Sequence, residues 1–443
     1  MLPLPTRFLA CSLALVAIDA PAATREGSAT RQVAWLRAEA TPLRSIQPGD
    51  GDFSDLEPLR SVLAGKQVVV LGEATHGDGA SFLAKTRLVH FLHQELGFDV
   101  LAFESGFYDC AKAWERIRAG EDPAAAFRQS VFSIWTRSVQ MQPLIDYFST
   151  AARSARPLEL AGVDPQFTGQ ISERYLLGDL KRAAETAGLP ADEFATRISG
   201  PLANLVSGAY EKGEVPPAVA RAAFIEALDE LARRLREVGG DIPERSFWLR
   251  FSESTRQIAA NSWSADWSRP VLEDPKSYAV RDRLMGEQLA WLAQHRFAGR
   301  RIVVWANSFH AAREVDEIEV PSPVHMRLFR TFQPMGAVAR RELGKKLYTV
   351  AVLAYQGSYG SAFRQRQPIE LLRPSPDSLE DLFHRTGLPH AFLDLSRAER
   401  LPEWLRRPSI ARAMGYKEMR ARWGQVFDAI LFIDRMQASE KQP

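Results

Sequence analysis

A chain of 443 residues with 46% hydrophobic and 25% charged residues has enough apolar material for one large domain or two to three smaller ones. Its 56 lysines and arginines nearly balance its 54 aspartates and glutamates, so the formal net charge is only +2. This balance argues against a nucleic-acid-binding protein, which normally carries a basic excess on one face.

The N-terminus has the layout of a secretory signal peptide. Arg7 precedes the apolar stretch FLACSLALVAIDAPAA, which is too short to span a bilayer and ends in the small residues Ala20-Pro21-Ala22. We therefore expect residues 1–23 to be a signal peptide and the mature protein to be exported, to the periplasm or the medium. No later stretch is long and apolar enough for a transmembrane helix, so we expect no stable membrane insertion after signal removal.

Seven short apolar runs, separated by helical patterns, predict a mostly parallel central sheet flanked by helices, which is an α/β fold. The runs span residues 67–73, 99–105, 158–164, 301–308, 347–355, 391–396 and 428–434. Between the first two, residues 80–97 carry apolar side chains at helical spacing and end at Gly97, which predicts a βαβ unit.

Helical patterns replace the strand patterns in the middle of the chain. We expect a helical insertion or lobe over about residues 170–270, within a single α/β catalytic domain that spans residues 24–443. Residues 437–443 look like a frayed tail.

Polar side chains stand where several of the predicted strands end. They are Glu73 and His76 after the first strand, Glu104 and Asp164 at the ends of the next two, and Asn307 and His310 after the fourth. Ligands of open α/β sheets bind outside the carboxyl ends of the strands, so we expect these groups to lie along one edge.

Three uses of such carboxylates and imidazoles remain open at this point. They are general acid–base catalysis, metal ligation by Glu73, His76, Glu104 and His310, and a structural polar network. Arg87, in the helix after the first strand, is expected to pair with Glu104 or to face a substrate anion, which disfavours a divalent metal. The chain has no G-x-S-x-G motif, which argues against a serine nucleophile of that type.

The motifs of the chain resemble those of the erythromycin esterase family. They include LGEATHG at residues 71–77, an arginine eleven residues after His76, GFDVLAFE, LELAGVDPQ, RDRLMGEQLAWL and RIVVWANSFHAAR. The matching blocks stand in the family's order from about Pro42 to Asp434. The resemblance implies an α/β protein with helical additions that opens the lactone ring of macrolides without a metal or cofactor.

The resemblance also implies the roles of individual residues. His76 is expected to be the base that activates water, with Glu73 as its partner, and Arg87 with Glu104 to help position that water. His310 matches the second-motif histidine, and Asn307, Asp164 and Arg313 are the candidate substrate-binding residues.

One departure concerns the second motif, which in the family reads W-A-H-N-x-H and here reads WANSFH, with Asn307 in place of a histidine. Asparagine donates and accepts hydrogen bonds but does not take up a proton near neutral pH. The leading hypothesis is a hydrolase of a small-molecule carboxylic ester or lactone that forms no covalent intermediate. The alternatives are a metal-dependent hydrolase or metal-binding protein that uses the same residues, and a non-catalytic ligand-binding member of the fold.

Overall fold

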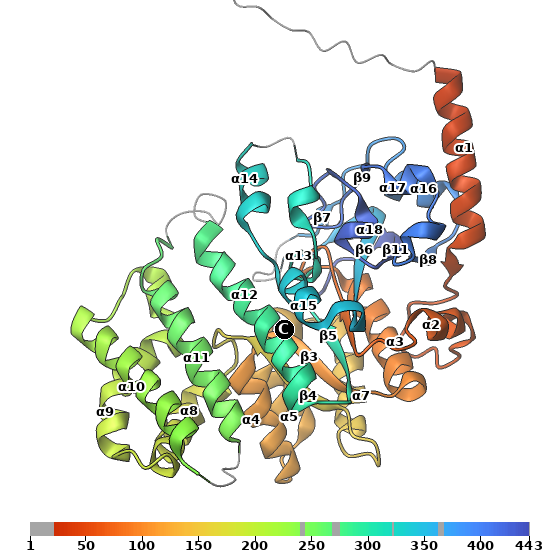
Figure 1. Cartoon of the computed structure of the whole chain (residues 1–443). Helices are drawn as coiled ribbons and strands as arrows, with labels where there is room; N and C mark the ends of the chain where they lie inside the picture. Colours follow the sequence, from red (N-terminus) through yellow and green to blue (C-terminus); the bar gives the residue numbers. More distant parts are fainter. Residues whose placement is uncertain (1–21, 240–243, 268–274, 321–322, 362–366, 443) are drawn as a thin grey trace, which may run out of the picture.

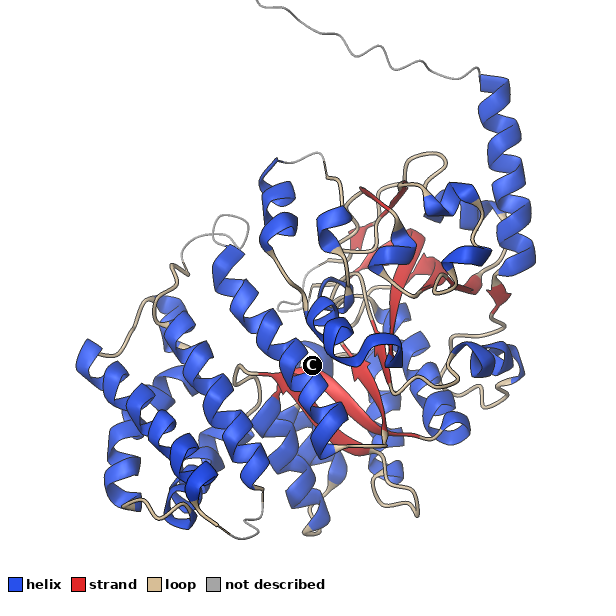
Figure 2. Ribbon diagram, in the orientation of Figure 1, coloured by secondary structure: helices blue, strands red, loops and turns tan. Residues whose placement is uncertain are grey.

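The computed structural model describes residues 22–239, 244–267, 275–320, 323–361 and 367–442. Helices cover both sides of a central sheet, which confirms the predicted α/β class (Figure 2). Residues 1–21 of the expected signal peptide lie outside these ranges, and residues 22–23 begin the helix α1 (Ala22–Glu39). No helix in the described ranges has the length and apolar character needed to cross a membrane.

Six neighbouring strands of the nine-stranded sheet run parallel. In spatial order they are β4 (Glu159–Asp164), β3 (Phe98–Gly106), β5 (Arg301–Trp305), β2 (Val68–Leu71), β6 (Leu347–Tyr359) and β11 (Ala429–Met436). The remaining three, β8 (His390–Asp394), β1 (Thr41–Pro42) and β7 (Ile369–Glu370), pair antiparallel with β11, β8 and β6 respectively. The run at 391–396 is thus a strand of the sheet, but an antiparallel one.

The first parallel strands follow the predicted βαβ pattern. β2 is apolar and buried along its whole length, as expected of a strand covered on both faces. It leads into α3 (Gly79–Leu96), which ends at Gly97 in the left-handed conformation, with φ of 70°, before β3 begins.

The described residues between β4 and β5 form helices, with no strand among them. Figure 1 shows α8 (Ile171–Thr186), α9 (Ala191–Ser207), α10 (Ala218–Glu237) and α11 (Arg245–Ser262) grouped on one side of the molecule. The next helix, α12 (Pro275–Trp291), packs against α11, β4 and α15 (Met335–Leu343). Therefore α12 connects the helical lobe with the sheet.

Shorter elements complete the fold. They are the helices α2 (Glu57–Val62), α4 (Phe107–Arg118), α5 (Pro123–Ser130), α6 (Ser133–Thr136), α7 (Gln142–Ala151), α13 (Ser308–Ala311), α14 (Pro323–Thr331), α16 (Leu379–Arg385), α17 (Glu403–Arg406) and α18 (Trp423–Val426), and the antiparallel strands β9 (Ser409–Ala411) and β10 (Met419–Ala421).

The segment after β11 is ordered by pairing, so the expectation of a frayed tail is wrong. Ala438 forms an antiparallel bridge with Asp78, and Lys441 forms one with Ser138. Backbone hydrogen bonds to two separate loops offset the entropy that usually frays a terminal segment.

The register of the sheet aligns three neighbouring strands at the level of Trp305. Trp305 of β5 pairs with Leu71 of β2 on one side and with Phe103 of β3 on the other. Just beyond this level lie Glu73 and Asn307, which follow β2 and β5, and Glu104, which is the residue after Phe103 within β3. This is the edge at which the sequence predicted a cluster.

Candidate active site

Glu73 is fully buried just beyond β2 because Gly72 lets the chain turn in a confined space. A Cβ atom on Gly72 would lie 2.6 Å from Ser308 Oγ and 2.7 Å from the carbonyl oxygen of Val350. The absence of a side chain at this position allows β2 to pass close to both neighbours. The backbone of Glu73 is held there by the N–H of Ser308, which donates to its carbonyl oxygen at 2.8 Å.

Three side chains bind the Glu73 carboxylate. Its Oε1 atom lies 3.0 Å from Nδ1 of His76 and accepts a hydrogen bond of 2.7 Å from Nε1 of Trp135, while Oε2 forms an ion pair with Lys85. A carboxylate oxygen accepts hydrogen bonds, so Nδ1 of His76 is the donor in this contact, and in the neutral ring Nε2 is the atom with the lone pair. The His76 ring, which stands edge-on to Trp135, is 22% exposed, whereas Glu73 is not exposed at all.

Lys85 is a site residue that the sequence interpretation missed. It is fully buried on α3, and its Nζ atom lies 4.0 Å from the centroid of the Trp305 ring. Burial lowers the pKa of Lys85, while the charge of Glu73 and its hydrogen bond act in the opposite direction. A signal was present, because Lys85 shares a helix face with the buried residues Phe82 and Val89.

Glu104, at the end of β3, binds groups from two other elements. Its Oε1 atom lies 3.1 Å from Nε2 of His310 and 3.0 Å from Nη2 of Arg281, and its Oε2 atom accepts the backbone N–H of Asn307 at 3.0 Å. Burial alone would raise the pKa of Glu104, but the charges of His310 and Arg281 and the hydrogen bond from His310 hold it well below its usual range.

His310 is held between two carboxylates and is therefore a cation. Its Nδ1 atom lies 2.7 Å from Oδ1 of Asp282, opposite the contact with Glu104. Burial lowers the pKa of His310, but the charges and hydrogen bonds of Asp282 and Glu104 outweigh it and raise the pKa to about 10. At neutral pH His310 supplies positive charge and does not act as a base.

Asp164, at the end of β4, is fully buried and binds Arg281. The Nε atom of Arg281 lies 3.0 Å from Oδ2 of Asp164, and the same guanidinium reaches Glu104. Arg281 and Asp282 are neighbours on α12, so the helical lobe contributes two adjacent residues of opposite charge to the cluster. Both residues lie in the motif RDRLMGEQLAWL, but the sequence alone predicts no role for either.

Asn307 contributes in two ways. Its backbone N–H binds Glu104, and its side-chain Oδ1 accepts the backbone N–H of Phe309 at 2.9 Å, which caps α13. Since Oδ1 serves the cap, the Nδ2 group is the part of the amide that can donate to a ligand.

The residues around Glu73 and the residues around Glu104 are neighbours in the fold. The N–H of Ser308 donates to the carbonyl oxygen of Glu73 at 2.8 Å, and the N–H of the adjacent Asn307 donates to Oε2 of Glu104 at 3.0 Å. The predicted residues Glu73, His76, Glu104, Asp164, Asn307 and His310 therefore do lie together at one edge of the sheet.

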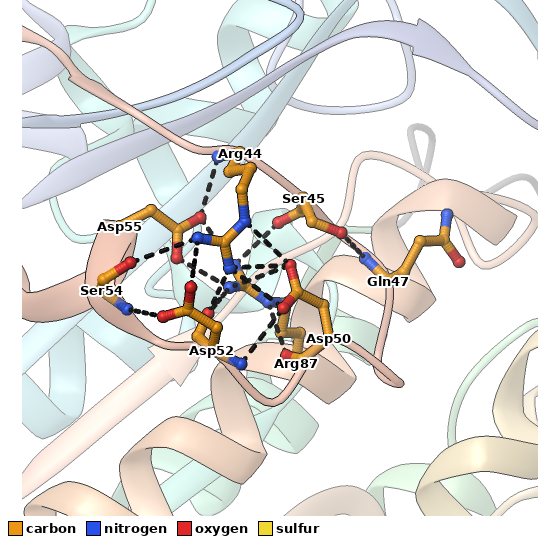
Figure 3. Close-up of polar contacts among 8 residues, drawn as sticks. All are labelled: Arg44, Ser45, Gln47, Asp50, Asp52, Ser54, Asp55 and Arg87. Atoms are coloured by element: carbon orange, nitrogen blue, oxygen red, sulfur yellow. Dashed lines mark hydrogen bonds and ion pairs between the residues drawn. The ribbon is translucent and has the colours of Figure 1, made fainter.

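Arg87 does not lie beside Glu104, which corrects the expected pairing. Its guanidinium binds both carboxylate oxygens of Asp55, at 2.7 and 2.9 Å, within the loop of residues 44–55 (Figure 3). The same group donates to the carbonyl oxygens of Ser45 and Asp52. Arg281 takes the place beside Glu104 that was expected for Arg87.

Arg313 also lies apart from the residues around Glu73 and Glu104. Its Nη1 atom is 3.0 Å from Oδ1 of Asp428, and its Nη2 atom donates to the carbonyl oxygen of Gly424 at 2.8 Å. Its contacts tie the loop after α13 to the segment before β11.

The described ranges contain no group of three or more histidine, cysteine, aspartate or glutamate residues arranged to hold a metal ion. The carboxylates of the cluster instead bind cationic side chains, Lys85 for Glu73 and Arg281 for both Glu104 and Asp164. The described residues therefore offer no preformed set of ligands for the metal-binding alternative.

A family model described as erythromycin esterase matches residues 93–436, a range that includes Glu104, Asn307 and His310 and begins after His76. The putative hydrolase YbfO of Bacillus subtilis is 26% identical over 424 residues, which are 91% of this chain and 91% of that protein. Erythromycin esterase type II of Escherichia coli is 20% identical over 431 residues, which are 92% of this chain and 98% of the esterase.

Two solved structures have the same fold. A succinoglycan biosynthesis protein superposes with a TM-score of 0.73 at 18% identity, over 94% of this chain and 99% of that chain. A mutant of the erythromycin esterase EreC in its open conformation superposes with a TM-score of 0.65 at 16% identity, over 90% and 98% of the two chains.

Proposed function

The chain belongs to the erythromycin esterase family, and from this premise we propose that it hydrolyses a carboxylic ester or lactone with water activated by His76. The family match confirms the resemblance that the sequence motifs indicated, and it supports a hydrolase with a small-molecule substrate. The observation that carries the proposal is the contact between buried Glu73 and Nδ1 of the partly exposed His76, which leaves Nε2 as a proton acceptor.

In the proposed reaction, Nε2 of His76 takes a proton from water while the water oxygen forms a bond with the carbonyl carbon of the substrate. The tetrahedral intermediate then collapses as the bond between that carbon and the alcohol oxygen breaks, and His76 returns the proton to the departing alcohol. The products are a carboxylic acid and an alcohol, and no bond to the enzyme forms. Glu73 stabilises the imidazolium, and Lys85 and Trp135 hold its carboxylate in place.

The negative charge of the intermediate needs a donor or a cation in a water-poor site. His310 offers a permanent positive charge, since its pKa is raised to about 10. Asn307, three residues before His310 in the second motif, offers the two protons of its Nδ2 group. We propose that these groups stabilise the oxyanion, so that the asparagine performs this task where the family motif has a histidine.

A panel of simple esters, lactones and macrolides tests this function, with each substrate assayed with and without a chelator. The expected result is hydrolysis of at least one substrate class that a chelator leaves unchanged and that His76→Ala reduces about 10²- to 10⁴-fold. Circular dichroism spectra of the variant and the wild type are compared to check that the variant folds. Equal turnover by His76→Ala would remove His76 from the mechanism, and loss of activity on chelation would favour a metal-dependent hydrolase.

The non-catalytic alternative gives a different result in the same panel. It predicts no turnover of any substrate, together with saturable binding of a ligand that calorimetry detects.

We also propose that the protein is exported, on the basis of the N-terminal sequence pattern. Fractionation of cells that express the full chain, with mass spectrometry of the N-terminus, is expected to find a processed form outside the cytoplasm. Full-length protein confined to the cytoplasm would overturn this proposal.

A further inference from the structure

Two stretches of chain carry the groups that bind the Oε1 atom of Glu73. One is the loop that presents His76 and continues through Gly77, and the other presents Trp135 and continues through Ser138. They are about sixty residues apart in the sequence. Both are in contact with a third segment, residues 437–442, which follows β11.

The first loop is held against this segment by its backbone. The N–H of Ser439 donates to the carbonyl oxygen of Gly77 at 2.8 Å, and the N–H of Ala80 donates to the carbonyl oxygen of Gln437 at 3.2 Å. A Cβ atom on Gly79 would lie 2.8 Å from the carbonyl oxygen of Ala438. The loop and the segment therefore approach as closely as a glycine allows.

The second stretch is held on the other side of the same segment. The N–H of Val139 donates to the carbonyl oxygen of Glu440 at 2.8 Å, and the N–H of Gln442 donates to that of Arg137 at 2.7 Å. The hydroxyl groups of Ser439 and Ser138 lie 2.8 Å apart, and Ser439 is buried. Ser439 thus bonds to both stretches, through its backbone to one and its side chain to the other.

We propose that residues 437–442 are a positioning segment, which fixes the His76 loop relative to the Trp135 stretch so that both side chains bind one oxygen of Glu73. The proposal rests on the proposed role of His76. The two bonds to Oε1, at 3.0 and 2.7 Å, demand that the two stretches keep a fixed separation. His76 is the more exposed partner, so the orientation of its ring depends on the loop that carries it.

A chain that ends at Met436 tests the proposal. Without the segment, the His76 ring is expected to lose its fixed contact with Glu73, so that kcat falls roughly tenfold to a hundredfold while KM changes by less than about threefold. A purely structural role would lower the amount of folded enzyme without this division between kcat and KM.

A second readout does not depend on turnover. Nitrogen-15 NMR distinguishes the two neutral tautomers of histidine, and the His76 signal is identified by its absence in His76→Ala. The full chain is expected to hold the proton on Nδ1, and the shortened chain to populate both tautomers. If His76 proves dispensable for hydrolysis, the proposed function fails, but this measurement still tests the positioning segment.

Two point variants separate the effect from a failure to fold. Ser439→Pro removes the N–H that Gly77 accepts and is expected to reproduce the loss of kcat and the mixed tautomers. Gln437→Ala is the matched control, because its exposed side chain is removed while the bond from Ala80 to its carbonyl oxygen remains. Wild-type kcat and a single Nδ1 tautomer in the folded Ser439→Pro variant would overturn the proposal.

Discussion

The Nδ1 atom of His310 lies 2.7 Å from the Oδ1 atom of Asp282, and this contact joins the second sequence motif to the helical lobe. Asp282 also accepts the backbone N–H of Met335 at 3.1 Å, so α12 and α15 are fixed around the same imidazolium. With Glu104 on its other nitrogen, His310 has a carboxylate on each side. The charge of this histidine is thus set by carboxylates from two separate elements, α12 and β3.

Asp282→Asn is expected to change the pH dependence of the reaction. His310 then keeps only the carboxylate of Glu104, so its pKa falls from about 10 toward the ordinary value of 6.5. The rate of the variant then falls as the pH rises from about 7 to 9, where His310 loses its proton, while the wild-type rate stays level. Steady-state kinetics across this range measure the effect.

The matched control for that experiment is Asp316→Asn, which changes an exposed carboxylate on the segment after α13. It should leave the pH profile as it is in the wild type. An unchanged profile in Asp282→Asn would show that His310 does not supply positive charge during the reaction.

Lys85→Met is expected to destabilise the protein strongly. The substitution leaves the carboxylate of Glu73 buried without its cation, a change that typically costs about 3–5 kcal/mol. Urea denaturation measures the loss in the free energy of unfolding. The double variant with Glu73→Gln removes the unpaired charge and should recover most of that stability, although not the activity.

Lys345→Met is the control, because Lys345 is exposed and lies in the turn before β6, whose first residue pairs with Val68, at the other end of β2 from Glu73. It should change the free energy of unfolding by less than about 0.5 kcal/mol. If Lys85→Met were no more damaging than this control, the ion pair would contribute little to holding Glu73.

Much of this arrangement was predictable from local patterns. Apolar runs gave the strands, and the carboxyl ends of parallel strands located Glu73, Glu104 and Asp164 at one edge. The direction of each strand was harder to predict, because an apolar run has the same pattern in a parallel strand and in an antiparallel one. The strand at 390–394 is antiparallel for a topological reason that its own residues do not encode.

The partners of the buried charges were harder to predict, because they come from distant parts of the chain. Arg281 binds Glu104 across 177 positions in the sequence, and its helix reaches the sheet only after the long helical insertion. Lys85 left a local signal, a charge on an apolar helix face. Arg87, only two residues further on, is aimed at a loop whose residues show no periodic pattern.

Arg87→Met is expected to lower stability without changing catalysis. The guanidinium holds the loop of residues 44–55 to α3 through Asp55 and the carbonyl oxygens of Ser45 and Asp52, as Figure 3 shows. Its loss should reduce the free energy of unfolding by about 3 kcal/mol or more. Activity per folded molecule, obtained by dividing turnover by the folded fraction from circular dichroism, should stay within about threefold of the wild type.

Arg281→Met provides the contrast, because Arg281 contacts two carboxylates of the candidate site. It should reduce kcat by at least about tenfold at a temperature where the variant is still folded. A larger loss of kcat in Arg87→Met than in Arg281→Met would restore the original assignment of Arg87 to the reaction.

The buried carboxyl of Asp78, in the loop after His76, makes stability depend on pH. Burial raises the pKa of Asp78 to about 7 in the folded state, against hydrogen bonds from Thr75 that lower it, whereas its ordinary value is 3.8. The folded state therefore holds a proton that the unfolded state releases. The stability from this group is fully present below about pH 4 and is lost as the pH rises through 7, with a slope on the order of 1 kcal/mol per pH unit.

Asp78→Asn removes this dependence because the amide does not ionise. Its free energy of unfolding, measured by urea denaturation from pH 5 to 8, is expected to fall less steeply than that of the wild type. Glu399→Gln, which replaces an exposed carboxylate, should follow the wild-type slope. Parallel slopes in Asp78→Asn and the wild type would mean that Asp78 is already ionised at pH 5 in the folded protein, and that the hydrogen bonds from Thr75 outweigh its burial.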